Sequence, residues 1–359
     1  MTRAGIAVVA RQELRLRVRA GRWKVLLGIW FAVLLLFTVL LRTSISRLQS
    51  GTVDGGVVIY GGLVLLVLAL ALLVVPALAA QSVNGDRERG TLATLQVTLL
   101  SPADIALGKF AAAWGASLVF LAASLPMTAY AMTQGGVTLG RVLVTTLVVA
   151  LLLGTVSAVA LALSALLART TTSAVLTYLA VFGLTVGTLV VFGLATATTS
   201  ERYTDSYTNT CPTLSELPPE MPDAQKQEIV SSCTPGRQTF TSTRVRPDKT
   251  WFLLAPNPFV VLADAAPALP PLTAAERRTR DRLESQGQGY TDVRDVDPLG
   301  SLGRTVRGLR DAPGGTRDRQ PVWPLGLAVD TALGVGALVL TTRRLRSPTR
   351  RLPRGQRIA

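Results

Sequence analysis

Six apolar stretches, each close to twenty residues or longer, constrain the fold of this chain more than any other feature of its sequence. A bilayer core about 30 Å thick is crossed by about 20 residues of helix. Only 16% of the residues are charged, against about 25% in soluble proteins. We therefore predict an all-α integral membrane protein with six transmembrane helices. The predicted spans are 23–41, 57–80, 110–132, 142–168, 173–197 and 325–342.

The distribution of basic residues predicts the orientation. Residues 1–24 hold seven Lys and Arg against the single acid Glu13, and residues 343–359 hold seven Arg and no acid. With the N-terminus in the cytoplasm, the tails and short loops inside receive 18 basic residues and the short outer loops receive three. Short loops rich in Lys and Arg stay in the cytoplasm. We therefore expect cytosolic N- and C-termini. We also expect the basic residues near these termini to contact membrane lipids.

The same distribution argues against a nucleic-acid partner, although the net charge is +15. The polar region from residue 201 to residue 319 is neutral, with 16 basic and 16 acidic residues, so the excess lies at the two ends. Arg outnumbers Lys 33 to 4, as in GC-rich coding sequences. Together these features favour a bacterial plasma membrane as the location.

These boundaries divide the chain into five parts. A basic interfacial helix (1–22) precedes spans one to five (23–197), an extracytoplasmic segment (198–321), the sixth span (322–342) and a basic cytosolic tail (343–359). The apolar run at 251–266 is excluded as a seventh span because prolines and an acid interrupt it, and a short interfacial or re-entrant element is expected there. Cys211 and Cys233 both lie in the extracytoplasmic segment, which favours a disulfide between them over two free thiols.

Several catalytic classes lack their essential residues. The chain contains no histidine, which removes the Ser-His-Asp, Cys-His and HExxH chemistries and the usual zinc sites. It also contains no GxxxxGK[ST] loop to cradle nucleotide phosphates, because Gly108-Lys109 is followed by Phe110. We expect a chain that is not an enzyme and binds no cofactor or metal.

The connection between the second and third spans, residues 81–109, carries the most specific pattern. Leucines follow a charged run with i, i+3, i+7 spacing on one helical face, and Ser101-Pro102-Ala103-Asp104 begins a new helix. The pattern fits a short amphipathic helix at the membrane face, or alternatively an ordinary connector with solvated charges. The residues concerned are Asp86, Arg87, Glu88, Arg89, Gly90, Thr91, Leu92, Leu95 and Leu99.

The run from Glu88 to Leu92, the following L-x-x-L, Ser101-Pro102 and Gly108-Lys109 together resemble the permease subunits of ABC-2 type transporters. The basic lead, the six spans and an outer segment before the last span also fit that family. The resemblance implies that 81–109 is a coupling loop that docks on a separate ATP-binding subunit, which would use the ATP. It also implies export and a second permease copy, identical or different.

One acid, Asp330, lies inside the sixth span. An intramembrane acid indicates a pathway or a pairing role, with Arg141 a conceivable partner, or else a shallow group hydrated from the surface. Two other functions remain open. An ion-coupled transporter would use such acids, although only this one is found, and a membrane-anchored sensor or assembly protein would bind its ligand through residues 198–321.

Overall fold

A computed structural model describes residues 2–19, 21–48, 55–90, 100–209, 211–233, 236–287, 292, 294–310 and 320–346. Within these residues six helical segments are long and apolar enough to cross a membrane, which confirms the six predicted spans. The chain is therefore a mostly helical, multipass membrane protein. The spans are α2 (Gly21–Leu48), α3 (Gly55–Ala79), α6 (Pro102–Ala123) with α7 (Leu125–Thr133), α8 (Leu139–Leu166), α9 (Thr170–Phe182) with the π-helical turn η1 (Gly183–Gly187) and α10 (Thr188–Thr198), and α15 (Trp323–Arg344).

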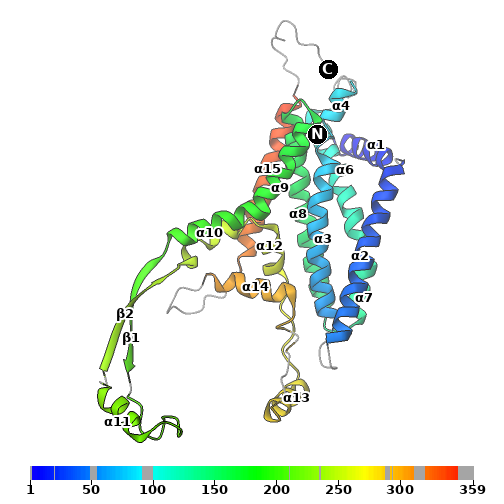
Figure 1. Ribbon diagram of the computed structural model, residues 1–359. Helices are drawn as coiled ribbons and strands as arrows, with labels where there is room; N and C mark the ends of the chain where they lie inside the picture. The colour runs from blue at the N-terminus through cyan, green and yellow to red at the C-terminus, as the bar shows by residue number, and fades with distance from the viewer. Residues whose placement is uncertain are drawn as a thin grey trace.

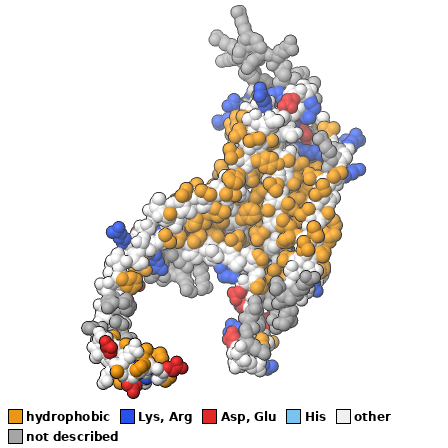
Figure 2. All heavy atoms as spheres, viewed as in Figure 1, with side chains coloured by type: hydrophobic (Ala, Val, Ile, Leu, Met, Phe, Trp, Pro, Cys, Tyr) orange, Lys and Arg blue, Asp and Glu red, His pale blue; other side chains and the backbone are white. Residues whose placement is uncertain are grey.

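The helices α3 and α8 form the centre of the bundle. More than half of their most apolar stretch is buried, and Leu63 and Leu68 of α3 and Leu152 and Leu153 of α8 belong to the main core. The fifth span is only 11% buried over the same length. Its apolar side chains lie in the orange band that covers the middle of the molecule (Figure 2). An apolar outer surface of this kind suits lipid tails as a solvent.

The N-terminal helix α1 (Arg3–Arg19) lies across one end of the bundle, which also holds α4 (Asn84–Glu88) and the last turn of α15 (Figure 1). We call this end the α4 end. Leu345, just after α15, packs there with Val83 and Ile105. The first and last described helices therefore meet at the same end, as an even number of crossings requires.

The fifth span bends as it leaves the bundle. The first half, α9, packs against α8 and α3, whereas α10 runs outward to a β-hairpin (Figure 1). The π-helical turn η1 lies at the bend. Such turns insert one extra residue per turn and are frequent at functional sites.

The expectation of an all-α chain misses this hairpin. Strands β1 (Glu201–Asn209) and β2 (Gly236–Arg244) pair antiparallel, from Glu201 opposite Arg244 to Asn209 opposite Gly236. Thr is frequent in both strands, with two Tyr in β1 and one Phe in β2, and the preference of these residues for extended backbone was hidden by the polar composition. The predicted disulfide between Cys211 and Cys233 is confirmed beyond the far ends of the strands, with a Cα–Cα distance of 5.7 Å.

The other elements in the described part of the segment between the fifth and sixth spans are short helices. Residues 251–266 form a 3₁₀ turn and a short helix, and this region is not among the six candidate spans. The helix α12 packs on α14, α15 and α8. The short elements are α11 (Asp223–Ser232), η2 (Pro247–Lys249), η3 (Trp251–Leu254), α12 (Pro258–Ala265), α13 (Ala274–Ser285) and α14 (Pro298–Gly308).

Candidate functional site

Lys109 is the centre of the polar contacts at the α4 end. Helix α6, on which it lies, starts with the predicted cap: the Ser101 hydroxyl accepts from the Asp104 backbone N–H, and the Asp104 carboxylate accepts from that of Ser101. About two turns later the side chain of Lys109 is completely buried. A buried ammonium is stable only when it is paired and hydrogen-bonded, so its partners determine how this end is held together.

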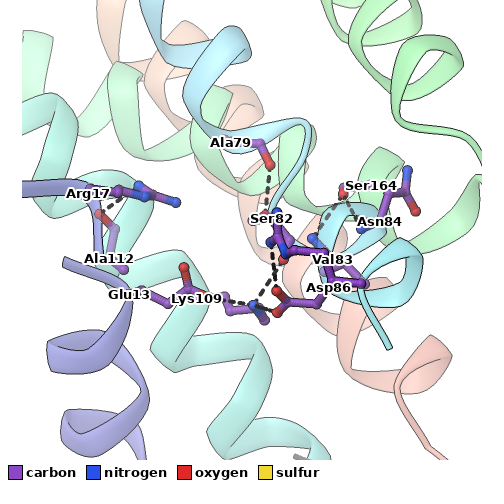
Figure 3. Close-up of polar contacts among 11 residues, drawn as sticks. Glu13, Arg17, Ala79, Ser82, Val83, Asn84, Asp86, Lys109, Ala112 and Ser164 are labelled. Atoms are coloured by element: carbon purple, nitrogen blue, oxygen red, sulfur yellow. Dashed lines mark hydrogen bonds and ion pairs between the residues drawn. The ribbon is translucent and has the colours of Figure 1, made fainter. Parts of the chain in front are cut away.

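Three groups, from α1, from α4 and from the turn before α4, surround the ammonium of Lys109 (Figure 3). Its Nζ donates to the carboxylates of Glu13 in α1 and Asp86 in α4, and to the carbonyl oxygen of Ser82 at 2.9 Å. All three N–H donors of the ammonium are thereby used. Lys109 therefore ties the N-terminal helix and the α4 turn to the start of the third span.

The glycine before Lys109 makes this arrangement possible. A Cβ at Gly108 would lie 2.6 Å from the Cβ of Val9 and 3.1 Å from the carbonyl oxygen of Ile6. Only glycine lets α1 approach α6 this closely. Arg17 of α1 adds a bond from its Nη1 to the carbonyl oxygen of Ala112, at 3.2 Å. Gly108 thus allows the close approach of α1 to α6, and Lys109 pairs with charged groups of the neighbouring elements.

The residues that follow Asp86 bind the connection between α8 and α9. Arg87 Nη1 donates to the carbonyl oxygen of Leu167 at 3.2 Å, just after α8 ends. Glu88 Oε1 accepts from the backbone N–H of Thr170 at 3.2 Å, the first residue of α9. A carboxylate at a helix N-terminus is favourable because the first N–H groups have no partner within the helix.

A hydroxyl from α8 completes the attachment of α4. The backbone N–H groups of Val83 and Asn84 both donate to Ser164 Oγ at 3.1 Å (Figure 3). The side-chain Nδ2 of Asn84 donates to the carbonyl oxygen of Arg169 at 3.4 Å. Both partners belong to the end of α8 and the loop after it. The α4 segment is thus bonded to α6, α8 and α9, and it is linked to α1 through Lys109. We call Glu13, Asp86, Arg87, Glu88 and Lys109 the α4 clamp.

The structure describes only some of the residues predicted to form the coupling loop. Asp86 and Arg87 belong to the clamp, and the exposed Arg89 pairs with Asp86 at 3.0 Å. Glu88 and Gly90 are also exposed, and Gly90 has the left-handed φ of +71° that favours glycine. The predictions for Thr91, Leu92, Leu95 and Leu99 lie outside the described residues.

Sequence reasoning missed the roles of Lys109 and Glu13. In the sequence, Lys109 is one of the basic residues that predict the orientation of the chain and is part of the Gly108-Lys109 motif. Glu13 is the only acid in the basic N-terminal lead. Each residue is isolated from others of its charge, and this could have indicated their roles. Lys109 is a single lysine at the start of an apolar span, and Glu13 is a single acid among arginines. Opposite charges isolated in this way are candidates for mutual pairing.

Asp330 lies in the bundle interior, away from this end, and its suggested pairing with Arg141 is wrong. Arg141 Nη2 instead bonds both carboxylate oxygens of Asp297, at 2.9 Å and 2.7 Å, with both side chains buried. Asp297 precedes α14 and could not be recognised from sequence among the acids of the long segment. Within the described residues, Asp330 Oδ2 is buried without a hydrogen-bond partner.

The described residues contain no group of three or more Cys, Asp or Glu side chains arranged to hold a metal ion. The two cysteines are joined to each other. A comparison with protein-family models returns no match, and a comparison with curated proteins likewise returns none. Function must therefore be argued from the sequence motif and the geometry of the α4 clamp.

Proposed function

We propose that this chain is the membrane-spanning permease subunit of an ATP-driven exporter, with ATP hydrolysed by a separate ATP-binding subunit that docks on residues 81–109. The observation that carries the proposal is the α4 clamp. Three consecutive side chains, Asp86, Arg87 and Glu88, reach three different parts of the bundle. A force applied to this short segment is passed directly to the ends of several spans.

The basic residues support a cytosolic position for the α4 end. Arg87, Arg89 and Lys109 lie there together with the arginines of α1 and Arg343 and Arg344 of α15. Figure 2 shows blue side chains gathered around this end of the molecule. The positive-inside rule supports an orientation in which a soluble ATPase can reach α4. The plasma membrane of a bacterial cell is the location that we propose.

In the proposed mechanism the partner subunit contacts the exposed side of α4 and the residues after it. Glu88, Arg89 and Gly90 are exposed there, and the leucines predicted to share one helical face follow them in the sequence. Movement of α4 displaces α6 through Lys109 and α9 through the cap at Thr170. Because each contact is a charged or backbone hydrogen bond with a defined direction, the helices move with α4 rather than slide past it.

Dimerisation is part of the proposal and rests on the resemblance to ABC-2 permeases. The second copy, identical or different, would complete a translocation route between two six-helix bundles. The fifth span offers exposed apolar side chains along its length. The transport direction, export, is also inferred from the resemblance alone.

The test is co-purification of the tagged full chain, in detergent, with an ATP-binding subunit, sought first among the products of neighbouring genes. Glu88→Ala combined with Leu92→Ala should abolish the complex while leaving the permease folded. The matched control is Glu284→Ala combined with Leu214→Ala, an exposed Glu and Leu in the segment between spans five and six. The control should retain the ATPase in full.

Retention of the ATPase by the Glu88/Leu92 variant would contradict the docking site. Loss of the ATPase from the control alone would place docking at the opposite end and reverse the proposed orientation. A neighbouring gene for a kinase or protease, instead of an ATPase, would favour a sensor or assembly role for the chain.

A further inference from the structure

A small cavity of about 10 Å³ lies between α15, α8, α3, the π-helical turn η1 and α12. This is close to the least space that one water molecule needs. Most of its wall is apolar, with Leu72, Val156, Leu184 and Pro258 among the lining residues. The polar side chains are Thr155, Thr185 and Asp330. A single acid therefore faces an apolar space deep in the bundle.

The acid is poorly accommodated as an anion. Asp330 is 2% exposed, and its Oδ2 has no hydrogen-bond partner among the described residues. An ionised carboxylate in an apolar interior needs a counter-charge or several donors. The hydroxyl of Thr155 donates to the backbone carbonyl of Asp330 at 3.1 Å and not to its carboxylate. The neutral, protonated acid is the form that this environment accepts.

Ionisable groups on the surrounding helices all have other partners. Arg141 of α8 pairs with Asp297, Asp264 of α12 with Arg307, and Lys109 of α6 with two carboxylates. The remaining groups are bonded to backbone or hydroxyl partners and line no part of this cavity. They are Asp104 of α6, bonded by Thr2 and Ser101, Tyr60 of α3, bonded to Thr145, and Tyr178 of α9, bonded to Leu73. On α15 itself, Arg343 and Arg344 lie in the last turn, more than three turns from Asp330.

The same cavity touches the bend of the fifth span. Leu184 and Thr185 belong to η1. Asn257, the cap of α12, donates through Nδ2 to the Thr185 carbonyl at 2.7 Å and the Thr188 hydroxyl at 2.8 Å. The bend is thus bonded by an amide at the start of α12, and the next residue, Pro258, lines the same cavity as Asp330.

We propose that Asp330 is a proton-binding site: at neutral pH its Oδ2 carries a proton, and release of that proton opens the junction between α15, η1 and α12 to water. The reaction is simple ionisation. The O–H bond breaks, the proton passes to an entering water molecule, and the carboxylate retains the electron pair. The proposal concerns this chain alone and does not depend on an ATP-binding partner.

Water access can be followed with a single reporter thiol. Thr185→Cys places a thiol on the cavity wall, and the two natural cysteines are already joined to each other. The full chain in lipid nanodiscs is reacted with a small water-soluble thiol reagent across a pH series. Each rate is divided by that of Thr279→Cys, an exposed position of α13 outside the candidate spans, to correct for thiolate formation. Thr177→Cys, buried on α9 away from the cavity, is the closed control.

We expect the corrected rate at Thr185→Cys to rise about tenfold for each pH unit until the carboxylate is fully formed. With Asp330→Asn, a neutral isostere of the protonated acid, the rate should be low and independent of pH. An infrared band of a protonated carboxylic acid should be present in the parent chain at neutral pH and missing in Asp330→Asn.

Three results would overturn the proposal. One is a rate without pH dependence in the Asp330 background, and another is a pH dependence that survives in Asp330→Asn. The third is a rate that follows the concentration of Na⁺ or K⁺ at fixed pH, which would make the cavity a metal-cation site. Absence of the infrared band from the parent chain would contradict the protonation state independently.

Discussion

The α4 clamp and the cavity at Asp330 each contain an ionisable side chain buried in an apolar bundle, but the surroundings of the two side chains are opposite. At the clamp, the buried Lys109 has two carboxylates and a carbonyl oxygen around it. In the cavity, a buried acid has an oxygen with no described partner. Paired charges fix the positions of helices, whereas an unpaired acid must change its protonation or its surroundings. We propose that the first part of the bundle transmits movement and that the second can open.

The largest expected effect is that of Lys109→Met. The substitution removes the ammonium and leaves Glu13 and Asp86 as mostly buried carboxylates without their common partner. Removing one member of a buried ion pair destabilises by about 3–5 kcal/mol, and here Glu13 loses its ion-pair partner while Asp86 keeps Arg89. The measurement is the free energy of unfolding in detergent micelles.

Lys24→Met is the matched control, because Lys24 is exposed and no ion pair involves it among the described residues. Its effect should stay within about 0.5 kcal/mol. Equal stability of the two variants would mean that the α4 clamp does not hold the bundle together.

A second pair of charges allows the same idea to be tested at the other end of α8. Arg141→Leu alone leaves Asp297 buried without its partner and should destabilise by about 3–4 kcal/mol. The double variant Arg141→Leu with Asp297→Leu removes both charges, so its free energy of unfolding should be closer to that of the parent chain. A double-mutant cycle measures the difference. Additive effects would show that the two residues act independently.

Gly108→Ala tests the approach of α1 to the third span. The new methyl group would meet Val9, so α1 must shift, at about 1–3 kcal/mol. Limited proteolysis at the arginines of α1 should become faster. Gly28→Ala in α2 is the control, since no atom lies within 4 Å of the added carbon. Unchanged proteolysis in Gly108→Ala would contradict the close packing of α1.

The smallest effect concerns exposed charges at the base of the hairpin. Hydrogen bonds from Lys249 and Arg246 lower the pKa of Glu201, and a bond from Arg246 lowers that of Asp248. A lowered pKa stabilises the folded form above the ordinary carboxyl value of about 4, and the contribution disappears as pH falls through the lowered pKa. Acidification below about pH 4 should therefore loosen the hairpin base slightly.

Hydrogen exchange of the β1 and β2 amides, corrected for its intrinsic pH dependence, provides the measurement. In Glu201→Gln these amides should exchange faster already at neutral pH, and their exchange should change less on acidification. A hairpin whose protection is the same in both proteins at every pH would show that these surface pairs contribute nothing measurable.

Sequence alone predicted the elements that depend on local pattern. Apolar length predicted the six spans, Ser101-Pro102-Ala103-Asp104 predicted the start of α6, and the two cysteines predicted their bond. The hairpin was missed because its polar composition concealed the β-branched and aromatic residues. Local pattern is informative where neighbours along the chain decide the structure.

Pairs that are distant in sequence were not predictable in the same way. Lys109 meets Glu13 across 96 positions, and Arg141 meets Asp297 across 156. Asp330 could be recognised as unusual from its position in a span, but its neighbours η1 and α12 depend on how the fifth span bends. Such contacts follow from packing, for which the sequence of one chain gives no direct signal.

The most direct test of the central claim is whether ATP binding by the partner subunit moves the spans through the α4 clamp. Spin labels at Val25→Cys on α2 and Val175→Cys on α9, both exposed, report the distance between these spans in the reconstituted complex. Our account predicts that trapped ATP changes this distance in the parent chain. It also predicts a smaller change with Arg87→Met, which loses the bond to Leu167 while the contacts of Asp86 and Glu88 remain. An unchanged distance in the parent chain, or the same change in Arg87→Met, would contradict it.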